Sequence, residues 1–359
     1  MSSEPTDGQS IRDQVDRVIN RTVQRSVKGL NFIRSGKEPV GLTPKELIYE
    51  KGTLRLYHYR STADEVYRIP LIIVMATTNK SYLFDLFPGQ SMVEYLLIQG
   101  FDVYMMDWDT PTQQERHLDF ADYTQDFIPS CIEKVQENSG EQDVSILGYC
   151  MGGVLSAIYA ATHADGPLAN LACLTTPVNW HEMGLFSHWN NERYFDVDKL
   201  VDTVGIIPGD FISSGFDMLR PAQKMASRIR VWDNMWNDDY VQSYRAFDRW
   251  GSETVPLAGE YFRQTTKELM WKNKLYSGEM EVAGKSANLA NITIPIMHTI
   301  AEHDHIVPVA ASRPLLELVS SKDKEELVLK GGHVSLIAGP NAVKRMWPNV
   351  SQWLAKRSV

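Results

Sequence analysis

The sequence lacks the features that mark several large classes of protein. Its 359 residues include only three cysteines, Cys131, Cys150 and Cys173, which are far apart and odd in number. They form neither a disulfide framework nor a C-x-x-C pair, so a reducing compartment is the natural expectation. The first ten residues lack the apolar core of a signal peptide, and no apolar run reaches about 18 residues. The sequence therefore predicts a cytoplasmic protein without a transmembrane segment.

Positive charge and cofactor motifs are also scarce. The chain has 36 Lys and Arg residues against 45 Asp and Glu, a net charge of -9, whereas binding to nucleic acid needs concentrated positive charge. Neither G-x-G-x-x-G nor a Walker A pattern occurs, so we expect no nucleotide cofactor. His303 and His305 flank Asp304, but no third ligand has a recognisable spacing. We therefore expect neither a nucleic-acid partner nor a metal ion.

Short apolar runs alternate with helical patterns over most of the chain. Runs of this kind are typical of strands buried on both faces, and their alternation with helices indicates a mostly parallel sheet covered by helices on both sides. The runs span residues 71–75, 103–106, 144–147, 171–174, 294–297 and 326–329. Residues 54–59 alternate between apolar and polar and predict an early antiparallel strand. Before them, Thr43-Pro44-Lys45-Glu46 has the pattern of a capped helix start.

The main chemical signal is Gly148-Tyr149-Cys150-Met151-Gly152-Gly153, which lies between a predicted strand and a helix-compatible run. It matches the nucleophile elbow G-x-S-x-G with Cys in place of Ser. Glycines are needed there because the nucleophile occupies a strained turn at which strand and helix approach closely. The start of a helix also favours an ionised thiol. Taken alone, the motif leaves a second interpretation open, namely a buried structural cysteine.

Two further residues favour the catalytic interpretation. Asp304 follows the predicted strand at 294–297, and His333 follows the one at 326–329. The chain order nucleophile, acid, histidine is that of α/β-hydrolases. We predict a thiolate nucleophile at Cys150, a general base at His333, and Asp304 as the group that orients the imidazole. Backbone amides of Met151 and Thr77 are the expected oxyanion donors.

The chain divides into three predicted parts. Residues 41–177 and 291–359 form an α/β-hydrolase core. Residues 178–290 are rich in Trp, Asp and Asn and are too long for a simple connection, so they predict a mainly helical cap. Residues 1–40 form an N-terminal extension whose apolar side chains recur every three or four residues from 11 to 34. This basic amphipathic helix either packs on the main domain or binds a partner or a surface.

Taken together, these motifs resemble the polyhydroxyalkanoate (polyester) synthases, particularly the short catalytic subunits of the two-component classes III and IV. The resemblance runs from about Gly41 to Leu354. The motifs that carry it are the cysteine elbow, Asp304-His305-Ile306-Val307-Pro308, Gly331-Gly332-His333, Gly100-Phe101-Asp102-Val103-Tyr104, Asp107-Trp108 and Tyr261-Phe262-Arg263-Gln264. Asp109, Ile206 and Ala258 depart from the family pattern, which usually has Gly, Asn and Pro there. These departures concern substrate preference and cap geometry more than the reaction.

The resemblance implies an acyltransferase that adds 3-hydroxyacyl groups from coenzyme A thioesters to a growing polyester. It implies release of coenzyme A through a covalent cysteine thioester, with Cys150, Asp304 and His333 as the family's triad. It also implies a second synthase subunit, a homo-oligomer and a location at cytoplasmic polyester granules. Coenzyme A thioester would be the substrate, so no cofactor is expected.

Two other functions remain open from the sequence. The same triad could serve an ester or thioester hydrolase, and the fold could persist in a catalytically idle granule-binding or scaffold protein. A thiolate that attacks a thioester forms another thioester, so the acyl group stays activated for an incoming hydroxyl. A cap that excludes water would favour that hydroxyl over hydrolysis.

Overall fold

A computed structural model describes residues 7–34, 36–61, 63 and 65–359, without the side chains of residues 7–14, 17, 18, 30, 31 and 33. Its contacts divide the chain into two compact units. The larger unit comprises Val40–Leu219 and Glu253–Val359, and the smaller unit joins the chain up to Pro39 with Arg220–Ser252. This grouping was not predicted from the sequence. The predicted division into extension, core and cap stays a prediction.

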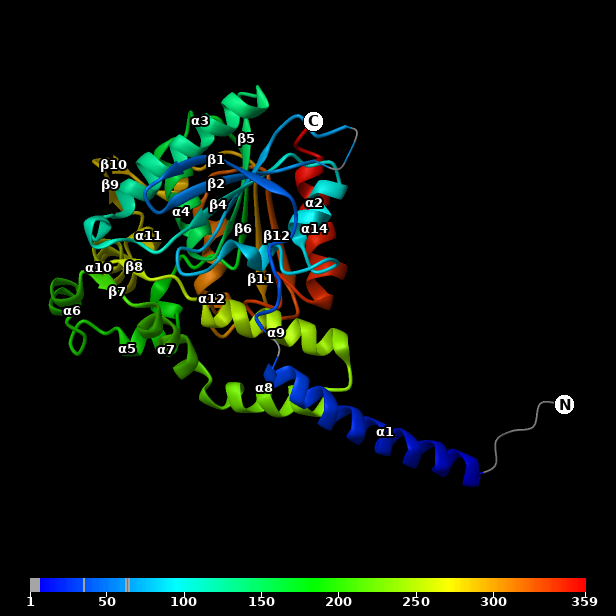
Figure 1. Ribbon diagram of the computed structural model, residues 1–359. Coiled ribbons are helices and arrows are strands. Elements are labelled where there is room, and N and C mark those ends of the chain that lie inside the picture. The colour runs from blue at the N-terminus through cyan, green and yellow to red at the C-terminus, as the bar shows by residue number, and fades with distance from the viewer. Residues whose placement is uncertain (1–6, 35, 62, 64) are drawn as a thin grey trace. The chain divides into compact units, whose positions relative to one another are not determined.

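The larger unit is built on a sheet that has eight strands within the described residues, in the order β1-β2-β4-β3-β5-β6-β11-β12 (Figure 1). The strands are β1 (Lys45–Lys51), β2 (Leu54–Tyr59), β3 (Leu71–Val74), β4 (Val103–Trp108), β5 (Val144–Tyr149), β6 (Leu168–Leu174), β11 (Ile296–Ala301) and β12 (Lys324–Leu329). β2 pairs antiparallel with β1 and β4, and the neighbours from β4 to β12 are parallel. The predicted mostly parallel sheet and its early antiparallel strand are confirmed.

The predicted helix start at residues 43–46 is wrong. Strand β1 begins at Lys45 and pairs with β2, so the segment is extended. Thr43 does not cap a helix, because its hydroxyl donates to Asp85 Oδ1 at 2.6 Å and its amide to Asp85 Oδ2 at 3.1 Å. A tertiary partner and a neighbouring strand therefore override a local sequence signal that is weak on its own.

Helices cover both faces of the sheet, as predicted. Figure 1 shows α2 (Met92–Ile98) and α14 (Trp347–Ala355) together on one side, with α3 (Ile128–Ser139) and α4 (Met151–Thr162) on the other. Rings of Tyr95 and Trp347 join the first pair, with centroids 5.6 Å apart. Helix α4 is buried along almost its whole length, which fits its place between the sheet and neighbouring elements. The short helices α12 (Val309–Ser312) and α13 (Pro314–Leu318) connect β11 to β12.

The part of the larger unit between β6 and β11 is mainly helical. It contains α5 (Leu185–Trp189), α6 (Val197–Val204), α7 (Gly209–Leu219), α10 (Gly259–Gln264), the π-helical segment η5 (Thr265–Trp271) and α11 (Lys274–Ser277). Two-residue strands β7 (Ile206–Ile207) and β8 (Leu257–Ala258) pair within it, as do β9 (Glu281–Val282) and β10 (Lys285–Ser286). Two residues that depart from the family pattern, Ile206 and Ala258, are direct register partners in the β7–β8 pair. These two departures from the family pattern therefore fall in the same place, the β7–β8 pair.

The smaller unit contains α1 (Asp7–Arg34), α8 (Pro221–Asp233) and α9 (Asp238–Ser252). The predicted N-terminal helix is thus a helix. Lys28 Nζ lies 2.8 Å from Asp238 Oδ1, and the Trp232 ring lies against Gly29. The face of α1 turned away from these contacts exposes Val15, Ile19, Val23 and Val27. The side chains of Ile11, Val18, Leu30 and Ile33, which belong to the predicted stripe, lie outside the described residues.

Candidate active site

Cys150 lies in the turn between β5 and α4, as the elbow motif predicted. Its backbone angles are φ 53° and ψ -118°, a conformation that non-glycine residues rarely adopt. The Cys150 amide donates to the Leu174 carbonyl oxygen at 2.9 Å, which ties the turn to the end of the neighbouring strand β6. The turn thus presents Cys150 at the carboxyl edge of the sheet, at the start of a buried helix.

Two glycines of the motif allow this close approach. A Cβ atom added to Gly152 would lie 2.1 Å from the carbonyl oxygen of Val74, and one added to Gly153 would lie 1.9 Å from Thr176 Oγ1. Both separations are far shorter than any real contact between such atoms. The first turn of α4 therefore packs directly against the ends of β3 and β6, and only glycine fits.

Asp304 and His333 form a buried pair at the ends of β11 and β12. His333 Nδ1 lies 2.7 Å from Asp304 Oδ2, with 5% and 0% of their side-chain surfaces exposed. The other oxygen, Asp304 Oδ1, accepts the amides of Ile306 at 2.8 Å and Val307 at 2.9 Å. The carboxylate is therefore held at both oxygens, and it fixes the imidazole with Nδ1 protonated.

Cys150 lies close enough to His333 to change the pKa of the imidazole. Burial lowers the pKa of His333, but the charges of Asp304 and Cys150 and hydrogen bonds to both outweigh burial and raise that pKa to about 10. The structure therefore brings together the three residues predicted as a triad. This arrangement suits a thiol that gives its proton to a neighbouring histidine, although the catalytic roles stay predictions.

The predicted oxyanion donors lie at the same place. Met151 is the first residue of α4, so its amide has no acceptor within the helix. Thr77 follows β3 and lines the same cavity as Cys150 and Met151. Its hydroxyl donates to the phenol oxygen of Tyr261 at 3.3 Å, which anchors the loop that carries the Thr77 amide. Their part in binding an oxyanion stays a prediction.

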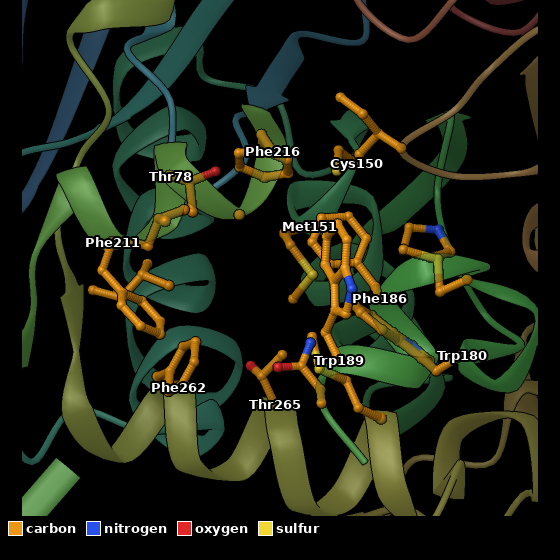
Figure 2. Close-up of a pocket in the computed structure, with 18 of the residues that line it drawn as sticks. Thr78, Cys150, Met151, Trp180, Phe186, Trp189, Phe211, Phe216, Phe262 and Thr265 are labelled. Carbon is orange, nitrogen blue, oxygen red and sulfur yellow. The ribbon is translucent and has the colours of Figure 1, made fainter. Parts of the chain in front are cut away.

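Cys150 opens into an apolar cavity of about 420 Å³ (Figure 2). Eight aromatic side chains from the helical part of the larger unit contribute to its lining: Trp180, Phe186, Trp189, Phe195, Phe211, Phe216, Tyr261 and Phe262. In Figure 2, Cys150 and Thr265 lie at opposite ends of this cavity. The tryptophans of residues 178–290 are evident in the sequence, but their positions in the fold are not. Only Trp180 and Trp189 reach the cavity, whereas Trp232, Trp236 and Trp250 belong to the smaller unit.

Tyr149 is a site residue that sequence analysis missed. Its ring centroid lies 5.2 Å from that of His333, so it supports the imidazole. Its hydroxyl is buried and has no hydrogen-bond partner among the described residues. Burial, and then the charge of Cys150, raise the pKa of Tyr149, so the phenol stays neutral. The position directly before the elbow nucleophile was the available signal.

The remaining candidates lie apart from this chemistry. Cys131 and Cys173 are fully buried, and burial raises the pKa of each thiol, in Cys173 to about 12. Both are core residues. Among the described residues, no three His, Cys, Asp or Glu side chains are grouped so as to hold a metal ion. No helix within the described range is long and apolar enough to cross a membrane.

Comparison with known proteins agrees with this architecture. Residues 70–340 match the alpha/beta hydrolase fold family, and residues 17–96 match the poly-beta-hydroxybutyrate polymerase (PhaC) N-terminus. The poly(3-hydroxyalkanoate) polymerase subunit PhaC of Haloferax mediterranei is 34% identical over 348 residues, which cover 96% of this chain and 70% of that protein. That of Allochromatium vinosum is 34% identical over 331 residues, covering 91% and 92%. The chain belongs to the poly(3-hydroxyalkanoate) polymerase family.

Membership confirms the resemblance read from the motifs and makes the chain an enzyme of the acyltransferase class. Solved structures agree on the fold. The monoacylglycerol lipase of Paleococcus ferrophilus aligns with a TM-score of 0.55 at 18% identity, covering 84% of this chain and 99% of that one. At that identity the likeness concerns the α/β-hydrolase fold alone.

Proposed function

We propose that the chain polymerises 3-hydroxyacyl groups from coenzyme A thioesters into a polyester and holds each acyl group on Cys150 as a thioester. The observation that carries the proposal is a strained elbow cysteine beside a buried histidine–aspartate pair, open to an apolar cavity. Related proteins named poly(3-hydroxyalkanoate) polymerase support the choice of substrate. The substrate brings coenzyme A with it, so the proposal needs no cofactor.

The first half of the reaction loads the enzyme. The Cys150 thiolate attacks the thioester carbonyl, and the amides of Met151 and Thr77 stabilise the oxyanion that forms. When the carbonyl re-forms, the bond to the coenzyme A sulfur breaks. The leaving thiolate takes the proton from the His333 imidazolium, so free coenzyme A departs and Cys150 carries the acyl group.

The second half transfers the acyl group to a hydroxyl. His333 removes the proton from the hydroxyl of an incoming 3-hydroxyacyl unit or chain end, and the resulting oxygen attacks the acyl-Cys150 carbonyl. The carbon–sulfur bond breaks, an oxygen ester forms, and the Cys150 thiolate returns. Converting a thioester to an oxygen ester is downhill. The aromatic lining of the cavity favours an acyl chain over water, which supports polymer formation rather than hydrolysis.

The exposed stripe on α1 supports proposals about partners. Four apolar side chains at 50–58% exposure, Val15, Ile19, Val23 and Val27, form one face of the helix. Apolar surface of this kind is typical of an interaction face. We include in the proposal a second synthase subunit, a homo-oligomer and a location at polyester granules in the cytoplasm.

A turnover assay tests the proposal. Purified protein is given 3-hydroxybutyryl coenzyme A, with and without a co-expressed second subunit, and both coenzyme A release and the acyl product are measured. We expect insoluble polyester with coenzyme A release, and weak activity for the chain alone. Free 3-hydroxy acid instead of polymer would indicate a hydrolase, and no release of coenzyme A would indicate an idle scaffold. A Cys150→Ala variant is the blank.

A further inference from the structure

The end of β6 carries the backbone that holds the elbow. Leu174, its last residue, accepts the Cys150 amide at 2.9 Å. The next residue, Thr175, has φ 45°, a strained value for a β-branched residue, and its amide donates to Thr299 O at 2.8 Å. Backbone in such a conformation persists only when surrounding contacts hold it. The position of Cys150 therefore depends on how this segment is fixed.

Thr176 links the same segment to the first turn of α4. Gly153 leaves no room for a Cβ atom against Thr176 Oγ1, so the two residues move together. The Ser312 hydroxyl of α12 donates to Thr176 O at 3.0 Å. A displacement of Thr176 would thus reach Cys150 by two routes, through Leu174 and through Gly153.

The Thr176 amide donates to Nε2 of His298 at 3.3 Å. His298 lies in the middle of β11 and is fully buried. Because Nε2 accepts a hydrogen bond, the ring must be neutral with its proton on Nδ1. Burial lowers the pKa of His298 to about 3, so the ring keeps this form over the working range of pH. Nδ1 itself has no partner among the described residues.

We propose that His298 is a positioning residue for Cys150, a neutral buried acceptor that fixes Thr176 and, through it, the nucleophile elbow. His298 touches neither the thiol nor the His333–Asp304 pair in any contact described above. It acts on the reaction only through the backbone of Thr176 and the packing of Gly153. The inference rests on the proposed role of Cys150 as nucleophile.

Two substitutions separate the acceptor from the rest of the side chain. In His298→Gln, the amide oxygen can take the place of Nε2 and accept the Thr176 amide. In His298→Asn, the shorter side chain places its oxygen near the former Nδ1 and leaves that amide without an acceptor. Both replacements are polar, neutral and smaller than histidine. Their difference therefore reports the hydrogen bond to Thr176 more than burial or volume.

The readout is the rate at which iodoacetamide alkylates Cys150 as pH is varied, together with kcat and KM for 3-hydroxybutyryl coenzyme A and with Tm. Cys131 and Cys173 are buried, so alkylation of the folded protein reports Cys150, with Cys150→Ala as the blank. Alkylation needs no polymerase activity. It therefore tests the position of the thiol even if the proposed function fails.

We expect His298→Gln to stay within about twofold of the natural protein and His298→Asn to lose about tenfold in both alkylation rate and kcat, with KM little changed. Equal losses in the two variants, or losses that only follow Tm, would overturn the proposal. If His298→Asn does not fold, Ser312→Ala decides, because it removes the hydrogen bond to the carbonyl oxygen of Thr176. A severalfold slower alkylation supports the proposal, and an unchanged rate overturns it.

Discussion

The carboxylate of Asp304 contacts the imidazole of His333 at 2.7 Å through one oxygen while two backbone amides occupy the other. The acid is therefore held in one orientation before any substrate arrives. Because the pair is almost completely buried, its interaction is little screened by solvent. The histidine beside Cys150 is thus kept in the tautomer that leaves Nε2 for the thiol or the incoming hydroxyl.

Replacing Asp304 by Asn should separate the two halves of the reaction. Asp304 raises the pKa of His333, so the variant should have a lower His333 pKa and a weaker base. A thiol at a helix start needs little help to ionise, whereas an alcohol needs the full pair. We expect labelled acyl-enzyme to accumulate while polymer formation falls by roughly 100-fold or more. Absence of label on this variant, with normal loading of His333 variants, would reverse the assigned roles.

The stability of the protein should depend on pH through His333. Its pKa is raised from 6.5 to about 10 in the folded protein, so the native state binds the extra proton over that range. The stabilisation is complete below pH 6.5 and is lost as pH rises through about 10. Because the Cys150 thiolate that helps to raise this pKa has itself lost a proton, the free energy of unfolding should fall, by up to about 1.4 kcal/mol per pH unit, mainly above about pH 8.5, where an unfolded thiol also ionises. Urea titrations at several pH values measure the free energy of unfolding of the natural protein and of His333→Gln. An equal dependence on pH in the two proteins would contradict this role of His333.

Tyr149 should be needed for its ring and not for its hydroxyl. The hydroxyl is buried without a partner, so Tyr149→Phe should leave the free energy of unfolding unchanged or raise it by about 1 kcal/mol. Tyr149→Ala removes the ring that packs on His333 and should cost roughly 3–5 kcal/mol and most of the activity. Denaturant unfolding and turnover of both variants provide the check. Loss of activity in Tyr149→Phe would show that the hydroxyl takes part in the reaction.

The α1 stripe should mediate association and contribute little to folding. Changing Ile19 and Val23 to Ser removes exposed apolar surface and leaves the face that contacts α8 and α9 intact. We expect the share of protein recovered with the second subunit or with polyester granules to fall severalfold, with Tm unchanged. Deletion of residues 1–35 should impair association at least as much. Equal recovery of altered and natural protein would remove the stripe from the proposal.

The sequence was sufficient for features that depend on local pattern. The buried strands could be predicted because their apolar runs lie on both faces of a sheet, and Cys150 and Asp304 because each follows such a strand. The predicted burial of residues 326–329 is wrong, because β12 is the edge strand of the sheet and is largely exposed, although His333 follows it as expected. The extended conformation of Lys45–Lys51 was missed even though its partner β2 begins only three residues later, because the pattern at residues 43–46 favoured a helix and the bond from Thr43 to Asp85 is a long-range contact. The support of His333 by Tyr149 and of Thr176 by His298 are also long-range contacts, for which the sequence carries no periodic signal.

The residues that line the cavity could not be predicted from the sequence either. Phe186, Phe211 and Phe262 come from three separate helices and meet only in the folded structure. Their aromatic character could be read from the sequence, but equally aromatic Trp232 and Trp236 lie in the smaller unit. Composition therefore predicted a cap rich in aromatic residues without telling which of them would face Cys150.

The proposed mechanism requires that the Cys150 thiolate carry the acyl group. Serine has no accessible ionised form near neutral pH, so its attack would depend wholly on His333. It is also smaller than cysteine, and a misplacement of about 1 Å can cost roughly 100-fold in rate. An acyl group held by serine would be an oxygen ester, which lacks the driving force for transfer to another hydroxyl.

Coenzyme A release and polymer yield from purified Cys150→Ser, beside Cys150→Ala and the natural protein, therefore show whether the thiolate is required. We expect Cys150→Ser to make almost no polymer and to release at most residual coenzyme A, close to the Cys150→Ala blank. Polymer formation by Cys150→Ser at nearly the natural rate would show that the thiolate is dispensable and would contradict the account.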